Sequence, residues 1–439
     1  MNRLSSSQST TPSDAWTWSV QLLERWQTGT ERVDWLLESL PRGMGGGERA
    51  RVQALLVGAV RNLTRIKDKL DRLMTRPPRP IVEAALIVAG VELLESDPAP
   101  GHAAKVGHHL VERVKQLASP KEAAFANAVG RKLAVALMSE ATEPTDSDSA
   151  DTWSIFYSHP IWLVERWREQ LGDAMTRQLL VVNQTPASVT VRLRPGAALT
   201  QSLPAWLNPI DGAPDFYTAE SGHWAELRGL LESGDVHVQD AATRLAIDLL
   251  DPQSGETVLD LCAAPGGKSL AMADRMQKGK IVAFDMPGRR MPRLEESLQR
   301  VPAGVETATV SGDLLRSGAK ALEGAKQPLT YVAVLLDVPC SNTGVMRHRV
   351  DVKWRLQTDS FERHSSQQLD LLIAAAELVA ESGRLVYSTC SIDREENEQV
   401  VNAFLKRPNG SFELEATEVS LPWQSGCDGA AAFRLRRVS

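Results

Sequence analysis

The chain has 439 residues, of which 43% are hydrophobic and 24% charged, so it is too long for a single core and we expect two or three domains. This composition is typical of a soluble globular protein, and the most apolar stretch, residues 84–91, is too short to cross a bilayer as a helix. The polar N-terminus has no apolar segment of the kind that directs secretion. Four widely spaced cysteines predict neither a disulfide framework nor a zinc site, so we expect a cytoplasmic protein with free thiols and no metal.

The formal net charge of −6 argues mildly against a nucleic-acid partner. Basic side chains are nevertheless concentrated between residues 61 and 79, where seven Lys and Arg face only two Asp, which leaves a local charge of +5. Such a segment could contact phosphates, and on charge alone an ordinary solvated helix face is an equally good interpretation.

The pattern along the chain predicts two folded segments before a larger C-terminal domain. Helical periodicity dominates residues 14–138, whereas the acidic stretch that follows has almost no large apolar side chains and reads as a linker. We therefore expect a disordered lead-in at 1–13, a helical domain at 14–138, a linker at 139–151, a small α+β module at 152–240 and a strand–helix domain at 241–439.

In the C-terminal domain, short apolar strands alternate with turns and helical segments. This alternation predicts a mainly parallel sheet with helices on both faces. The expected strands are Val258–Leu261, Ile281–Asp285, Ala308–Val310, Tyr331–Asp337 and Arg384–Ser388.

A turn of small residues follows the first of these strands. Gly266 and Gly267 let the backbone approach a ligand, and the turn opens at the carboxyl end of the strand. It is not a phosphate-binding P-loop, because Cys262 stands where that pattern requires its first glycine.

Acidic residues end the second, third and fourth strands. Asp285 lies where a carboxylate can accept hydrogen bonds from ribose hydroxyls, Asp313 is placed to contact an adenine edge, and Asp337 ends the fourth strand. Each alone could equally cap a helix, but three together favour a nucleoside site.

Two strands end in thiols. Cys340 follows Asp337-Val338-Pro339, and Cys390 follows the strand that ends in Ser388-Thr389. Asp393 and Glu396 then have the spacing of a helix capping box. The two cysteines would face one cleft, although most free cysteines are small buried hydrophobes.

Together these segments resemble the RNA cytosine-5 methyltransferase family, whose Asp-Ala-Pro-Cys and Ser-Thr-Cys-Ser motifs carry two cysteines. Residues 261–268 match its cofactor turn almost letter for letter, and 159–164 and 238–242 look like its lead-in segments. Phe125–Val129 is similar to the NusB-like domain. The resemblance covers nearly the whole chain from about residue 14 and points to the bacterial RsmB (Sun/Fmu) type, which methylates 16S ribosomal RNA.

The resemblance implies a multidomain fold with an all-α NusB-like RNA-binding domain, a small α+β module and a Rossmann-like domain that uses S-adenosylmethionine. It implies Cys390 as the nucleophile, Cys340 as the thiol that assists product release, and Asp337 beside both the methyl donor and the target base. Asp285 would hold the ribose and Asp313 the adenine. The cofactor contacts would come from Asp337 and from Cys262, Ala263, Ala264, Pro265, Gly266, Gly267 and Lys268.

Three positions depart from the family pattern. Val338 replaces the usual alanine, Met286-Pro287 follows Asp285 where another acid is more common, and residues 428–433 match a C-terminal motif only loosely. None of them affects the two thiols.

The chemistry explains why the reaction needs these groups. Carbon 5 of cytosine is a poor nucleophile until a thiolate, here from Cys390, adds to carbon 6. Asp337, if protonated, would hydrogen-bond the ring N3 and amino edge, and Cys340 or a water it positions would remove the carbon 5 proton. The target base must be unstacked, and the expected RNA contacts are Arg347, Arg349 and Lys353 beside His348, with Arg61, Arg65 and Arg72 in the helical domain.

Three alternatives stay open on the sequence. The same chemistry could act on transfer RNA, or the chain could be an RNA-binding assembly factor with a vestigial site. Methylation of an exocyclic amine is less favoured, because no Asn/Asp-Pro-Pro-Tyr/Phe motif is present. Nothing in the sequence demands more than a monomer.

Overall fold

The computed structural model describes residues 14–94, 101–139, 143–197, 199, 203–407 and 411–438. The chain forms two compact units: unit 1 ends at Thr185 and also takes in Met346–Arg355, and unit 2 consists of Pro186–Val345 and Leu356–Ser439. The predicted lead-in at 1–13 and residues 140–142 of the predicted linker lie outside the described residues. The boundary expected at 139–151 is not where the chain divides, because residues 152–185 belong to unit 1 and not to the small α+β module.

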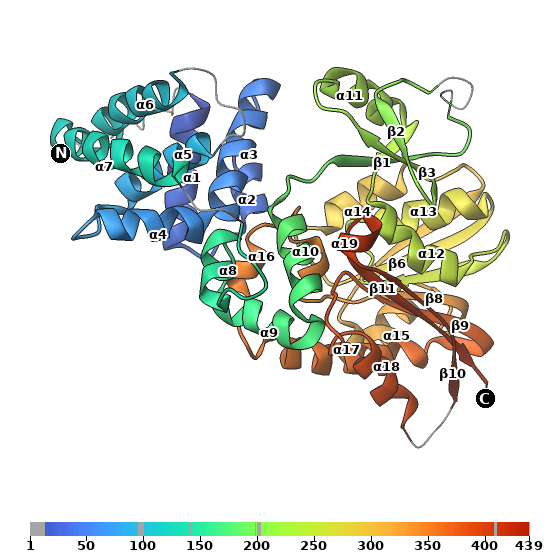
Figure 1. The fold of residues 1–439 in the computed structure, drawn as a ribbon. Helices are drawn as coiled ribbons and strands as arrows, with labels where there is room; N and C mark the ends of the chain where they lie inside the picture. The colour runs from blue at the N-terminus through green and yellow to red at the C-terminus, as the bar shows by residue number, and fades with distance from the viewer. Residues whose placement is uncertain are drawn as a thin grey trace, which may run out of the picture. The chain divides into compact units, whose positions relative to one another are not determined.

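Unit 1 is helical, as expected, and its chain can be followed from blue to green in Figure 1. Local capping explains where its helices begin: Asp14 accepts a hydrogen bond from the Thr17 amide, and Ser119 accepts one from the Glu122 amide. Helix α5 is apolar on nearly every side and lies in the core of this unit. The helices are α1 (Ala15–Thr28), α2 (Val33–Glu38), α3 (Gly46–Arg61), α4 (Leu63–Leu73), α5 (Pro80–Leu93), α6 (His102–Leu117), α7 (Pro120–Met138), α8 (Ala150–Phe156), α9 (Ile161–Leu171), α10 (Asp173–Gln184) and α16 (Val352–Arg355).

The segment Met346–Arg355 is inserted into unit 1 although the residues on both sides of it belong to unit 2. Val350 joins the apolar core of the helical unit, and the Trp354 indole donates to the carbonyl of Val60 at 2.8 Å. The Asp351 carboxylate accepts from the amide of Val33 at 3.3 Å. Apolar burial and hydrogen bonding therefore both hold this segment in unit 1.

Unit 2 begins with a small antiparallel sheet of order β2-β3-β1-β4. Its elements are β1 (Val189–Leu193), β2 (Leu207–Ile210), β3 (Ala213–Ala219), α11 (Trp224–Ser233), β4 (Val236–Val238) and the 3-10 turn η2 (Ala241–Thr243). Arg192 lies in β1 and Arg194 directly follows it. Both form ion pairs with the buried carboxylate of Asp274, each at 2.7 Å. These ion pairs join the small sheet to helix α13 (Gly267–Met276) of the larger domain.

The larger sheet of unit 2 has the order β10-β11-β9-β8-β5-β6-β7. Strands β5 to β9 are parallel, whereas β10 and β11 run antiparallel at one edge. The elements are α12 (Arg244–Leu250), β5 (Thr257–Leu261), α13 (Gly267–Met276), β6 (Gly279–Asp285), α14 (Met291–Leu298), β7 (Val305–Ser311), α15 (Leu314–Gly324), β8 (Tyr331–Asp337), η3 (Thr343–Val345), α17 (Ser360–Ala376), β9 (Val379–Thr389), α18 (Glu398–Leu405), β10 (Phe412–Ser420), α19 (Pro422–Ser425) and β11 (Ala430–Arg437).

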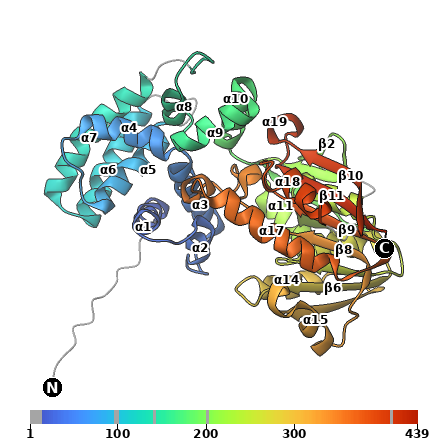
Figure 2. The ribbon, with the colours of Figure 1, turned by 90° about the horizontal axis from the view of Figure 1, so that it is seen from below.

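Helices cover both faces of this sheet. Helices α12, α13 and α14 pack on one apolar face, and α15, α17 and α18 pack on the other. Figure 2 shows α17 running along the sheet beside β8 and β9. The predicted Rossmann-like domain is therefore confirmed, with a sheet that is parallel in the five consecutive strands β9-β8-β5-β6-β7.

Among the helices that the structure describes, none combines the length and the apolar character needed to span a membrane.

Candidate active site

The turn after β5 lies where the strand order reverses. Strand β5 pairs with β6 on one side and with β8 on the other, and ligands of such sheets bind at this switch point. Gly266 precedes α13 with φ +101°, and a Cβ there would lie 2.7 Å from the Cβ of Ser297. Glycine is thus required at 266 by the protein itself. At Gly267 a Cβ would meet nothing nearer than Nε2 of His237 at 3.6 Å, so the protein leaves room there.

Asp285 ends β6 and is buried beside this turn. Its Oδ2 accepts a hydrogen bond from the amide of Ala264 at 2.7 Å, which fixes the carboxylate against the turn. A carboxylate has several acceptor positions, so Asp285 keeps capacity for a ligand hydroxyl.

Asp313 follows β7 and caps helix α15. Its carboxylate accepts from the amides of Leu315 and Arg316 at 3.0 and 3.3 Å. This is the helix-cap alternative that the sequence left open, and the contact with adenine stays a prediction.

Asp260, within β5, is a site residue that sequence reasoning missed. It is completely buried, its Oδ2 accepts from the Ser269 hydroxyl, and its Oδ1 has no hydrogen-bond partner in the part of the chain that the structure describes. Burial raises the pKa of this carboxyl to about 7. In the sequence, the signal that could have identified it is an acidic residue inside the apolar run Val258-Leu259-Asp260-Leu261.

Asp337 ends β8 and accepts hydrogen bonds at both oxygens. Lys268, from the first turn of α13, donates to Oδ2 at 2.7 Å, and Ser388 of β9 donates to Oδ1 at 2.8 Å. Burial lowers the pKa of Lys268, but attraction to Asp337 and the hydrogen bond to it outweigh burial, and the net pKa is raised. Two donors therefore hold this carboxylate in place at the end of β8.

The two predicted thiols meet at the same edge of the sheet. Cys340 and Cys390 have their sulfur atoms 3.2 Å apart, and the Cys390 sulfur lies 3.4 Å from Oδ1 of Asn342. They come together because β8 and β9 are parallel neighbours, with Asp337 in register with Ser388. Hydrogen bonding to Cys390 and burial raise the pKa of the Cys340 thiol well above its usual range. Burial also raises the pKa of Cys262.

The capping box predicted at Asp393 is wrong. Helix α18 begins at Glu398, and both acids face the thiol-bearing loops instead. The Thr343 hydroxyl donates to Asp393 at 2.6 Å, and the amide of Ser341 donates to Glu396 at 2.9 Å. Asp393 and Glu396 have the spacing of a helix cap, but their carboxylates accept hydrogen bonds from Thr343 and Ser341 in a neighbouring loop instead.

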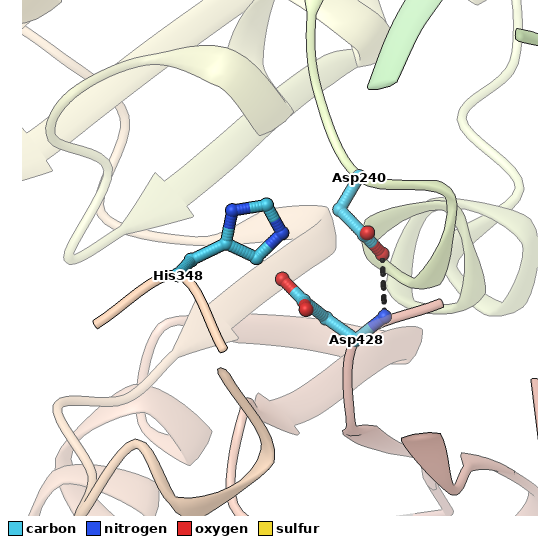
Figure 3. Close-up of side chains that lie close together, drawn as sticks. All are labelled: Asp240, His348 and Asp428. Atoms are coloured by element: carbon cyan, nitrogen blue, oxygen red, sulfur yellow. Dashed lines mark hydrogen bonds between the residues drawn. The ribbon is translucent and has the colours of Figure 1, made fainter. Parts of the chain in front are cut away.

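The segment before α12 also reaches the site. Gln239 donates to the carbonyl of Gly267 at 3.4 Å, so the end of the small sheet contacts the turn. The Asp240 carboxylate accepts from the amide of Asp428 at 3.1 Å, a bond drawn in Figure 3, where His348 of unit 1 is also labelled. A cavity of about 50 Å³ lies beside Cys390 and Lys268 in unit 2 and is lined by Asp240 and by residues 428–432.

The predicted RNA contacts divide into buried and accessible side chains. Lys353 is 2% exposed and donates to the carbonyl of Arg61 at 3.0 Å, and Arg61, itself 7% exposed, donates to the carbonyl of Arg347. Burial lowers the pKa of Arg61 to about 10 and lowers that of Lys353 well below its usual range. Lys353 and Arg61 therefore stabilise the segment Met346–Arg355 and are too buried to contact phosphates. Arg72 is exposed and pairs with Asp68.

Arg65 differs from the buried pair in being partly exposed, and its guanidinium lies 4.8 Å from the ring centre of Phe156. Arg65, Arg72, Arg347 and Arg349 thus stay as predicted RNA contacts.

Family models match both main domains. A model described as 16S rRNA methyltransferase RsmB/F matches residues 247–435, and the NusB family model matches residues 15–134. Proteins described as ribosomal RNA small subunit methyltransferase B are similar over most of the chain. The one from Vibrio cholerae is 32% identical over 87% of this chain and 88% of its own length, and the one from Erwinia tasmaniensis is 29% identical over 92% of each.

Solved structures share the fold. The structure of PH0851 matches with a TM-score of 0.77 and 22% identity, covering 98% of this chain and 99% of its own. NSun6 from Pyrococcus horikoshii, solved with SFG, has a TM-score of 0.53 and 18% identity over 64% of this chain and 98% of its own. At these identities the likeness concerns the fold alone.

Proposed function

The chain belongs to the RsmB/F family of ribosomal RNA methyltransferases, and from this we propose that it methylates carbon 5 of a cytosine in small-subunit ribosomal RNA through a covalent bond from Cys390 to carbon 6. The observation that carries the proposal is the pair of thiols 3.2 Å apart at the carboxyl edge of β8 and β9. One thiol is needed to form the adduct and a second group is needed to resolve it.

The residues around the turn fit S-adenosylmethionine, which supplies a methyl group on a sulfonium when bound. The buried Asp285 carboxylate, already oriented by Ala264, would accept from the ribose hydroxyls. The backbone of Gly267 approaches the site without a side chain, and Asp313 would lie toward the adenine. SFG, an analogue of this cofactor, is present in the NSun6 structure, which has a similar fold.

Cys390 must react as a thiolate, because an ordinary thiol, with a pKa of about 8.5, is only a few per cent ionised at neutral pH. Cys390 is among the groups whose charge raises the pKa of Lys268, so the Lys268 ammonium interacts with this sulfur. Lys268 would thus act on the nucleophile while Asp337 holds its amine in place.

In the reaction, the Cys390 thiolate bonds to carbon 6 and the electron pair of the ring double bond moves to carbon 5, which takes the methyl group. Asp337 would accept a hydrogen bond from the exocyclic amine and so orient the ring. Cys340, or a water that it positions, then takes the proton from carbon 5, and the bond between carbon 6 and sulfur breaks.

Arg65, Arg72, Arg347 and Arg349 are the proposed phosphate contacts. Because such contacts release counterions, each substitution by alanine should weaken RNA binding and make it less dependent on salt.

Two variants test the division of roles between the thiols. Cys390→Ala should abolish methylation, since no adduct can form. Cys340→Ala should accumulate a covalent complex with RNA, visible as a protein band of higher mass on a denaturing gel. Free RNA and normal turnover in the Cys340 variant would contradict its role in release.

The substrate is tested by mapping 5-methylcytosine by mass spectrometry in cells with and without the protein. Loss of one methylcytosine from small-subunit ribosomal RNA is the expected result. Loss confined to transfer RNA would keep the chemistry and overturn the substrate. No loss in either, together with no binding of S-adenosylmethionine, would favour an assembly factor with a vestigial site.

A further inference from the structure

The loop between β9 and α18 places three buried polar side chains beneath the two thiol-bearing segments. Asp393, Glu396 and Asn397 are each less than 5% exposed. Buried polar groups are retained where they are fully hydrogen-bonded, and such networks fix one arrangement of the chain. The contacts of these three side chains show which arrangement is fixed.

Glu396 holds the segment that carries Cys340. Its Oε1 accepts from the amide of Ser341 at 2.9 Å, and its Oε2 accepts from the Ser341 hydroxyl. Ser341 directly follows Cys340 in the chain, so a carboxylate grips the residue next to the thiol with two hydrogen bonds. Hydrogen bonds to a charged acceptor are the stronger kind.

Glu396 is itself held from the far side. Gln368 of α17 donates both to Oε1 of Glu396 at 2.9 Å and to the carbonyl of Pro339 at 3.0 Å. The Tyr387 hydroxyl donates to the backbone carbonyl of Glu396 at 2.5 Å. The residues on both sides of Cys340 are therefore fixed through Glu396 and Gln368.

The same loop also holds the segment that carries Cys390, through Asn397 and Asp393. Asn397 accepts from the Thr389 hydroxyl at 2.7 Å and donates to the carbonyl of Ser391 at 3.0 Å. Asp393 accepts from the hydroxyls of Thr343 and Ser391 at 2.6 and 3.3 Å. The loop thus joins the residues that flank both cysteines.

We propose that Glu396 is a positioning residue, whose carboxylate keeps the Cys340 sulfur within reach of Cys390 and of the adduct formed there. Glu396 contacts Ser341 and Gln368 and acts on the chemistry only through the place it gives to Cys340. The catalytic part of this inference rests on the role proposed for Cys340 in product release. The geometric part, that Glu396 holds the Cys340 sulfur close to Cys390, does not depend on that role.

The geometric part is tested without RNA, by the rate at which diamide oxidises the two thiols in the full chain. Each thiol gives up one hydrogen to diamide, which becomes the hydrazine, and a bond forms between the sulfur atoms. Peptide mapping by mass spectrometry identifies the bond between residues 340 and 390 among the chain's four cysteines. A disulfide needs the sulfur atoms about 2 Å apart in a specific geometry, so the rate reports how well the two segments are held together.

Glu396→Ala should slow formation of this disulfide at least about tenfold, because the Cys340 segment loses two charge-assisted hydrogen bonds. Glu396→Gln should restore the rate to within about threefold of the wild type, since its side-chain carbonyl still accepts from the Ser341 amide. Ser341→Ala, which removes one of the two bonds and leaves the backbone one, should give an intermediate rate and serves if Glu396→Ala does not fold. Glu362→Ala, at an exposed glutamate of α17, is the matched control.

A rate in Glu396→Ala and Ser341→Ala within twofold of the wild type and of the control would overturn the proposal. With RNA and S-adenosylmethionine, Glu396→Ala should also accumulate the covalent complex expected of Cys340→Ala, and Glu396→Gln should accumulate less of it. If Cys340→Ala itself traps no RNA, the role of Cys340 in release is wrong, while the diamide rates still decide whether Glu396 positions it.

Discussion

Gly266 and Gly267 are adjacent in the cofactor turn, yet the structure predicts opposite consequences for replacing each by alanine. A Cβ at Gly266 would lie 2.7 Å from the Cβ of Ser297 and 3.1 Å from Cδ1 of Leu294, at a backbone φ of +101°. The left-handed conformation costs a side-chain-bearing residue about 1–2 kcal/mol, and forcing α14 to move costs about 1–3 kcal/mol more. Gly266→Ala should therefore lower the free energy of unfolding of unit 2 by about 2–5 kcal/mol.

Gly267→Ala should leave that stability unchanged. Its Cβ would meet Nε2 of His237 at 3.6 Å and Nε2 of Gln239 at 3.9 Å, which are ordinary contacts, and alanine suits the first turn of α13. Any requirement for glycine at 267 must then come from a ligand. Gly267→Ala should weaken binding of S-adenosylmethionine at least tenfold in a protein that folds normally.

Scanning calorimetry and titration calorimetry separate the two effects. For a domain of 150–250 residues, 1 kcal/mol corresponds to about 2–4 °C, so Gly266→Ala should lower the melting temperature by about 4–20 °C and Gly267→Ala by less than about 2 °C. Equal melting temperatures for Gly266→Ala and the wild type would refute the steric reasoning. Normal cofactor binding by Gly267→Ala would refute the close approach of a ligand to that residue.

Three further predictions follow from buried charges. Burial and the neighbouring Arg192 and Arg194 lower the pKa of His237 to about 4, so at this side chain the folded protein binds fewer protons than the unfolded chain. The contribution of His237 to the free energy of unfolding is therefore fully present above pH 6.5. It falls by at most about 3 kcal/mol as the pH drops toward 4. His237→Asn should flatten this part of the curve of stability against pH, and an unchanged slope would contradict the assignment. Asp274→Ala should destabilise the protein by about 3–5 kcal/mol in denaturant unfolding, because it leaves the buried Arg192 and the partly buried Arg194 without their carboxylate. Lys353→Met should keep RNA affinity within about twofold in a filter-binding assay, and a tenfold loss would show that the amine reaches RNA after all.

The arrangement of the active-site residues was predictable from the sequence because it depends on one general rule. Parallel strands present their carboxyl ends at one edge of the sheet, so residues that follow successive strands meet there. Asp337, Cys340 and Cys390 were assigned to that edge from their positions after apolar runs, and the structure places all three together. The local alternation of strands and helices predicted this placement, whereas the roles expected of the two thiols came from the family resemblance.

Predictions failed where partners distant in the sequence decided the outcome. Lys353 reads as part of an exposed basic loop, but residues around it are inserted into unit 1, where its amine meets the carbonyl of Arg61. Asp393 and Glu396 have a spacing that fits a helix cap, and only the tertiary fold shows that buried hydroxyls and amides compete for them. Local spacing cannot distinguish a carboxylate that caps its own helix from one that binds a neighbouring loop.

The groups around the two thiols differ, and the difference bears on the roles proposed for them. Two thiols 3.2 Å apart would repel each other strongly if both were ionised. The Lys268 ammonium interacts with Cys390, whereas the charge of Glu396 adds to burial and to the hydrogen bond with Cys390 in raising the pKa of Cys340. Glu396, burial and the hydrogen bond therefore favour the protonated form of Cys340. In the proposed reaction a protonated Cys340 leaves the attack on carbon 6 to Cys390 and would act on the carbon 5 proton through the water that it positions. Glu396 is then relevant to the protonation of Cys340 as well as to the position of the loop.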